Sequence, residues 1–189
     1  MERVYRLAER IALAEGADLF IVRVSALLHD IGRAEEARDG SGDRHEELSV
    51  ERAKPFLEEA RVSPERASAI LHAIGAHRHR KDIKPRTLEA KCLYDADKLD
   101  SLGAVGIARS YLWLGEHGRS VYYEEASYIR VDPKDNSPEV DSTQREWHIK
   151  LSRLKDGMYT ETGKAIARER HERMARIIDE IEKEVKGEI

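Results

Sequence analysis

The chain carries a His-Asp doublet at the end of its most apolar stretch. His29 and Asp30 directly follow Ala26-Leu27-Leu28. Imidazole nitrogens and carboxylate oxygens are ligands of transition metals, and a charged group on an apolar helix is costly unless it is paired or bound to metal. The doublet is therefore a candidate metal site, although His and Asp near a helix end also serve as caps or bind backbone groups.

A second histidine shares a face with apolar residues. His77 lies three residues after Ile74 and seven after Ile70, on one helical stripe, whereas His72 falls between the apolar positions. A lone histidine on such a face is more often a satisfied core residue than a ligand. His77 is a candidate ligand only in combination with other groups.

Three carboxylates follow in a segment otherwise rich in apolar residues. On a helix Asp97 and Asp100 lie about 60° apart, and Asp95 points roughly the opposite way, as a residue of a solvated face would. His45 opens another helical segment, as a ligand or as a surface residue of its first turn. Asp30, His45, His77 and Asp97 fall on four different segments, and helix bundles hold metals in their cores in this way. The alternative is a purely structural helical protein.

The periodicity of the chain is helical almost throughout. Asp18 and Ser63 are expected N-caps, Gly16 an expected C-cap, and Pro55 should kink or split its helix. The segment from Leu19 is apolar nearly all round and should be buried. We expect an all-α bundle of about seven or eight helices, over residues 4–15, 19–30, 43–60, 64–77, 86–99, 103–114, 142–156 and 161–186, with loops over 31–43 and 78–85.

Composition limits the class of protein. The chain has 189 residues, which favours a single domain, 1–189. The net charge of −4 argues against a nucleic-acid binder; no apolar run is long enough for a membrane span, and no signal peptide is evident. One cysteine excludes a disulfide framework. We expect a cytoplasmic protein; 37% charged residues, with Asn136 and Gln144 as the only amides of their types, are typical of thermophiles.

Residues 115–141 lack the helical pattern. This connection is expected to be a lid or an insertion, and its Tyr122, Tyr123 and Tyr128 could stack on a nucleobase or pack the loop down. Helices of residues 142–189 are expected to pack on the core.

Four sequence stretches resemble the HD superfamily of metal-dependent phosphohydrolases, in particular its small stand-alone members. They are ALLHDIG at 26–32, HEELSVERA at 45–53, AIGAH at 73–77 and DADKLDSLGAVGIAR at 95–109, and RLKDGMYTETGKAIARER at 153–170 also matches. The resemblance implies an HD-domain-like helical fold and a metal held by His29, Asp30 and Asp97, with His45 and His77 as ligands of a second metal or of substrate phosphate.

The implied activity is hydrolysis of a phosphomonoester, phosphodiester or phosphoanhydride by a metal-activated water. The cofactor would be one or two divalent ions (Mn, Ni, Co, Fe, Zn or Mg), and the substrate a small phosphorylated molecule such as a nucleotide. Asp30 and Asp100 are the expected catalytic carboxylates, and oligomers remain open. The expected substrate-binding cations are Arg33, Lys98 and Arg109, each of which is otherwise a solvated charge.

The chain departs from the family pattern in two places. Residues 1–28 contain no histidine, whereas the family has a ligand in its first helix. We expect that the sequence is truncated at its start and that the missing histidine falls just before Met1; the alternative is a site with one ligand fewer. Arg33 stands where some nucleotidases of the superfamily have a Glu. A degenerate module that binds a nucleotide or metal in a regulatory role, without turnover, is the second hypothesis.

Overall fold

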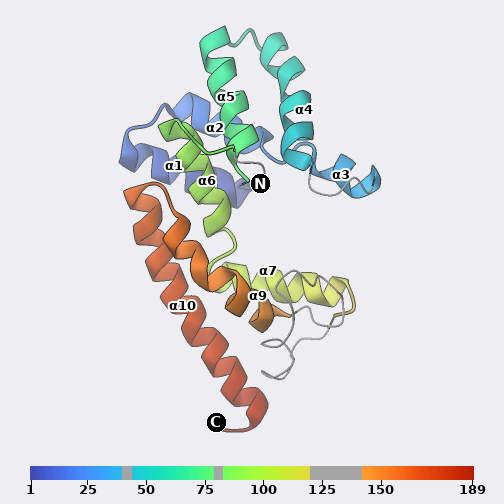
Figure 1. Ribbon diagram of the computed structural model, residues 1–189, viewed down its shortest axis with the longest axis vertical. Coiled ribbons are helices and arrows are strands. Elements are labelled where there is room, and N and C mark those ends of the chain that lie inside the picture. The colour runs from blue at the N-terminus through green and yellow to red at the C-terminus, as the bar shows by residue number, and fades with distance from the viewer. Residues whose placement is uncertain (40–43, 79–82, 120–141) are drawn as a thin grey trace. The chain divides into compact units, whose positions relative to one another are not determined.

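A computed structural model describes residues 1–39, 44–78, 83–119 and 142–189 of the chain (Figure 1). Every regular element in these ranges is a helix, so the all-α prediction is confirmed. Within the same ranges no helix is long and apolar enough to cross a membrane. Contacts divide the chain into two compact units, Met1–Lys98 with Tyr159–Gly163, and Leu99–Met158 with Lys164–Ile189. The single-domain assignment and the packing of residues 142–189 on the core stay predictions.

The first unit begins with two helices whose ends follow the local sequence. Helix α1 (Glu2–Glu15) ends at Gly16, which adopts the left-handed conformation with φ of 75°. Asp18 accepts hydrogen bonds from the backbone N–H groups of Phe20 and Ile21 and so caps α2 (Leu19–Leu28). Both caps agree with the sequence prediction. Helix α2 is less buried than predicted, because Leu27 is 48% exposed.

Three further helices of the first unit follow α2 along the chain. Helix α3 (Arg33–Asp39) replaces the loop predicted over 31–43. Helix α4 (His45–Glu59) continues past Pro55 and is not split there. Helix α5 (Pro64–Ala76) begins at Ser63, whose hydroxyl accepts from the Arg66 backbone as predicted. Helices α2, α4 and α5 share a core built from Ile21, Ala53, Leu57, Ile70 and Ile74.

Helix α6 (Leu88–Leu99) carries the acidic segment, and its Asp95 corrects the sequence reading. Asp95 is fully buried rather than solvated. Its carboxylate accepts from the backbone N–H groups of Tyr159 and Thr160, at 2.9 and 2.8 Å, and from the Thr160 hydroxyl. The Thr160 hydroxyl in turn accepts from the Gly163 N–H. Asp95 is therefore a structural group that ties residues 159–163 to α6.

The second unit contains α7 (Gly103–Glu116), α9 (Thr143–Ile149), the 3₁₀ helix η2 (Leu151–Gly157) and most of α10 (Glu161–Lys186). Helices α7 and α9 are joined by side-chain hydrogen bonds, between Ser110 and Thr143 and from Gln144 to Tyr111. The segment 120–141, with the three tyrosines of the predicted lid, lies outside the described residues.

Candidate metal centre

His29 and His77 occupy the same position at the ends of two different helices. Each is the residue that follows the last helical residue, of α2 and of α5. The Nδ1 atom of His29 lies 2.8 Å from the carbonyl oxygen of Ala26, and that of His77 lies 2.6 Å from the carbonyl oxygen of Ile74. Because a carbonyl only accepts, Nδ1 carries a proton in both rings, and Nε2 is the nitrogen that is left to bind a metal in the neutral form of each ring.

Both Nε2 atoms are buried and lack a hydrogen-bond partner among the described residues. Burial lowers the pKa of His77 to about 4, against the raising effect of Asp97. The imidazole is therefore neutral near pH 7, which is the form that binds metal. Two buried lone pairs without partners are unfavourable unless a ligand satisfies them.

Asp30 lies between the three histidines, and each of its carboxylate oxygens faces at least one Nε2 atom. Its Oδ1 is 3.5 Å from Nε2 of His45 and 3.7 Å from Nε2 of His77, and its Oδ2 is 3.6 Å from Nε2 of His29. Ligand atoms from Asp30, His45 and His77 all lie within 4.8 Å of one another. The rings of His29 and His45 both pack against His77, with centroids 5.2 and 5.4 Å apart.

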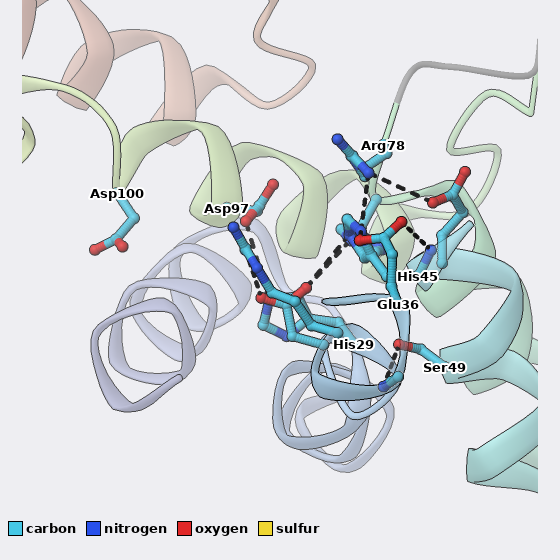
Figure 2. Close-up of polar contacts among 12 residues, drawn as sticks. His29, Glu36, His45, Ser49, Arg78, Asp97 and Asp100 are labelled. Carbon is cyan, nitrogen blue, oxygen red and sulfur yellow. Dashed lines mark hydrogen bonds and ion pairs between the residues drawn. The ribbon is translucent and has the colours of Figure 1, made fainter. Parts of the chain in front are cut away.

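Asp97 of α6 approaches the same group of side chains (Figure 2). Its Oδ1 lies 4.0 Å from Nε2 of His29, and its Oδ2 accepts from Lys98 at 2.9 Å. Burial raises the pKa of Asp97, but the Lys98 ammonium and the neighbouring imidazoles hold it below its usual value. Asp97 is thus an anion within the cluster.

His45 is held from behind by α3. Its Nδ1 lies 3.0 Å from Oε2 of Glu36 and 2.9 Å from a guanidinium nitrogen of Arg78. Oε1 of Glu36 accepts from the backbone N–H groups of Arg44 and His45. Burial raises the pKa of Glu36, yet these hydrogen bonds keep it below the usual value, so the group is ionised. The Nε2 atom of His45 faces Asp30.

These separations fit a bound ion better than they fit hydrogen bonds. Donor–acceptor distances of 3.5 to 4.0 Å are at or beyond the limit of a hydrogen bond. Ligands about 2.1 Å from one ion lie about 3 Å apart at right angles and about 4.2 Å apart when opposite. The donor set, neutral imidazoles with carboxylates, is also one that transition metals prefer. The residues present therefore fit the metal that the family resemblance implies.

Of the remaining predicted site residues, two contact the cluster and two bind each other. Arg33 is exposed, with a guanidinium nitrogen 3.3 Å from Oδ2 of Asp30, and Lys98 binds Asp97, so both cations contact the cluster. Asp100 and Arg109 belong to the second unit and bind each other at 2.6 Å. Their predicted catalytic and substrate-binding roles stay predictions. His72 lies apart, with its Nε2 accepting from the Arg86 N–H.

Sequence reasoning missed Glu36 and Arg78. Glu36 lies in the loop predicted over 31–43, and Arg78 lies in the basic loop predicted over 78–85. No periodic signal marks either one. Their only sequence cue is proximity to candidate ligands, since Arg78 follows His77 directly.

Two cavities in the described part of the chain are lined by residues of α4. One of about 300 Å³ lies between α4 and α5 and is bordered by Arg78. Another of about 530 Å³ lies along α3 and includes Arg38 and Arg52. The first has the size of a small-molecule site.

The fold agrees with comparisons to known proteins. A family model described as the HD domain matches residues 1–102. YpgQ of Bacillus subtilis, an uncharacterised protein, is 34% identical over 191 residues, which cover 99% of this chain and 83% of YpgQ. The crystal structure of YpgQ in complex with ADP matches with a TM-score of 0.75 and 34% identity, covering 98% of this chain and 87% of that one.

A crystal structure of an HD-superfamily hydrolase from Bacillus thuringiensis matches with a TM-score of 0.72 and 31% identity, over 98% of this chain and 84% of that one. The chain belongs to the HD domain family. Within it, the protein is a small stand-alone HD-superfamily member similar to YpgQ. The sequence-based recognition is confirmed.

Proposed function

We propose that this protein is a metal-dependent phosphohydrolase that cleaves a phosphoester or phosphoanhydride bond of a nucleotide. The observation that carries the proposal is the pair of buried Nε2 atoms, of His29 and His77, that face Asp30 without hydrogen-bond partners in the described part of the chain. A bound cation would satisfy both atoms. The family membership supports the same chemistry.

The carboxylate of Asp30 divides the ligands into two sets. Oδ2 of Asp30 faces His29, which also neighbours Asp97, and Oδ1 faces His45 and His77. This arrangement would hold two ions with Asp30 shared, or one ion on either set. A bound divalent metal would supply Lewis-acid stabilisation of the phosphoryl oxygens and a water of lowered pKa.

The chain's own cations would bind and orient the phosphate. Arg33 and Lys98 each pair with a carboxylate of the cluster, Asp30 and Asp97. From these positions Arg33 and Lys98 would each reach phosphate oxygens of a substrate held at the cluster, with which their charge-assisted hydrogen bonds would be strong. Because YpgQ was crystallised with ADP, a nucleotide is the substrate class that we propose for this chain.

Metal titration with matched variants tests the proposal. We expect the purified protein to contain or to take up Mn²⁺, Ni²⁺, Co²⁺, Zn²⁺ or Mg²⁺, and to release phosphate or pyrophosphate from nucleotides only with metal. His29→Ala and Asp97→Ala should each lower metal affinity and abolish turnover. His72→Ala removes a histidine outside the cluster and should do neither.

A protein that takes up no metal would overturn the proposal. Metal uptake without turnover on any nucleotide would instead favour a regulatory module.

A further inference from the structure

The carboxylate of Glu36 performs two tasks at the start of α4. Its Oε1 accepts from the backbone N–H groups of Arg44 and His45, at 2.6 and 2.9 Å, and so satisfies donors that a helix leaves free at its N-terminus. Its Oε2 lies 3.0 Å from Nδ1 of His45. One side chain thus fixes both the first turn of α4 and the ring that this turn carries.

The Nδ1 atom of His45 lies between two groups of opposite hydrogen-bonding character. Ionised Glu36 can only accept a hydrogen bond from Nδ1. The Arg78 guanidinium, whose nearest nitrogen lies 2.9 Å from the same Nδ1 atom, can only donate. A single nitrogen cannot donate to one and accept from the other at the same time. A proton on Nδ1 favours Glu36, and a bare Nδ1 favours Arg78.

The choice decides what the far side of the ring can do. With the proton on Nδ1, the Nε2 atom presents a lone pair beside Oδ1 of Asp30, 3.5 Å away, and can bind a cation. With the proton on Nε2, the ring donates towards Asp30 and cannot act as a ligand.

We propose that Glu36 is a positioning residue that holds His45 in its metal-binding tautomer, and that Arg78 opposes it until an oxyanion draws the guanidinium away. The inference rests on the proposed function, because the oxyanion is the phosphate of the substrate. Arg78 borders the cavity of about 300 Å³ between α4 and α5, where Lys54 is a second cation and where Glu46, Glu47 and Glu51 also line the wall. A guanidinium nitrogen of Arg78 lies 3.7 Å from the Glu46 carboxylate, so an oxyanion must compete with that carboxylate as well as with His45. Binding of phosphate and binding of metal then strengthen each other, as reciprocal linkage requires.

Glu36→Gln tests the first half of the inference. The glutamine oxygen replaces Oε1 in accepting from the two backbone groups, so its amide nitrogen must face Nδ1 of His45. That nitrogen donates, and it should drive the ring into the Nε2–H tautomer. We expect Mn²⁺ or Zn²⁺ affinity to fall about 10- to 100-fold, with the cap of α4 retained.

Glu35→Gln is the matched control. Glu35 lies next to Glu36 on α3 but pairs with Arg52 on an exposed surface. It should leave metal affinity unchanged. In a His45→Ala background, Glu36→Gln should have no further effect on metal affinity, because its target is gone; an additional loss of tenfold or more there would assign the effect to folding and overturn the inference.

The tautomer can be read directly in the metal-free, full-length protein by ¹⁵N–¹H NMR of the histidine rings. We expect Nδ1–H to predominate at His45 in the wild type and Nε2–H in Glu36→Gln. The same tautomer in both proteins would overturn the inference and leave the proposed function intact. Conversely, absence of metal binding by the wild type would remove the proposed function, while the tautomer measurement would still decide the role of Glu36.

Inorganic pyrophosphate tests the role of Arg78. Added to the metal-free wild type, it should raise the Nδ1–H fraction at His45, and added to Arg78→Leu it should change nothing. Arg78→Leu alone should already show the higher fraction. A wild-type tautomer ratio that does not respond to pyrophosphate or to Arg78→Leu would overturn this half.

Discussion

Replacing Gly32 with alanine should displace the start of α4 and weaken both the fold and the metal site. Gly32 lies two residues after Asp30, and its backbone N–H donates to the buried hydroxyl of Ser49 at 3.0 Å. A Cβ at position 32 would lie 2.6 Å from Cβ of Leu48 and 2.7 Å from the backbone nitrogen of Ser49. Neither neighbour is a flexible side-chain end, so the helix backbone must move.

The expected magnitude follows from two contributions. Overpacking costs about 1–3 kcal/mol, and loss of the hydrogen bond to Ser49 adds about 1 kcal/mol. We expect Gly32→Ala to lower the free energy of unfolding by about 2–4 kcal/mol, which is a drop in Tm of about 5–15 °C for a chain of this size. Because α4 begins with His45, metal affinity should fall as well.

Gly75→Ala provides the control for glycine removal as such. Gly75 lies inside α5, where a Cβ would meet only Cγ2 of Val50 at 3.5 Å, an ordinary contact. Alanine is the better helix former, so this variant should be as stable as the wild type or up to about 1 kcal/mol more stable. Urea unfolding of the three proteins decides the matter. If Gly32→Ala lies within about 0.5 kcal/mol of the wild type, the close approach between residue 32 and α4 is refuted.

Three further predictions concern caps and metal. Burial raises the pKa of Asp18, but the N–H groups of α2 and the charge of Arg66 hold it below the usual value. Asp18→Asn should therefore lower the free energy of unfolding at pH 7, by no more than about 1 kcal/mol, and this loss should disappear below about pH 4. A stability difference between variant and wild type that grows on acidification would contradict this sign. Thr160→Val removes the hydroxyl that donates to Asp95 and should cost about 1.5–3 kcal/mol in urea unfolding, whereas an unchanged midpoint would exclude a stabilising role. Chelation of metal from a loaded sample should lower stability by about 2.7 kcal/mol relative to metal at 100 times its Kd, seen as a fall in Tm; equal Tm values would mean that folding and metal binding are not linked.

The sequence predicted those parts of the fold that short-range hydrogen bonds decide. Gly16 ends α1, Asp18 caps α2 and Ser63 caps α5 because each of these residues acts on backbone groups within a few positions of itself. Prediction failed where distant contacts decide. Segment 31–43 has turn-forming residues at both ends, yet α3 forms between them and packs on α4.

Burial was the harder quantity to predict. Leu27 continues an apolar run and is nevertheless 48% exposed, because α2 packs with one side on α1 and another on α5. Pro55 leaves α4 whole because it lies on an exposed face, where water can satisfy the carbonyl that loses its partner. Asp95 looked solvated because the donors that bury it lie in residues 159–160, which no helical periodicity of α6 can reveal.

His29 and His77 could be proposed as ligands from the sequence because histidines are unusual on apolar helices, whereas the choice of Asp97 over Asp100 depended on the family resemblance. The orientation of their rings could not, because it depends on where the carbonyl groups of Ala26 and Ile74 point. The contacts of Glu36 and Arg78 with His45 could not be predicted either, because only the tertiary structure brings these side chains together.

The bonds from Asp95 to residues 159 and 160 have a consequence for synthesis of the protein. The acceptor and its donors are separated by 64 and 65 residues, and at about 5–20 residues per second the ribosome needs about 3–13 s to add the missing part. During this interval Asp95, two residues before Asp97, lacks its hydrogen-bond donors because residues 159 and 160 have not yet been synthesised. The compact unit that holds the metal cluster, Met1–Lys98 with Tyr159–Gly163, is therefore completed only after residues 159–163 have been translated, well beyond the stretch 1–102 that the family model matches.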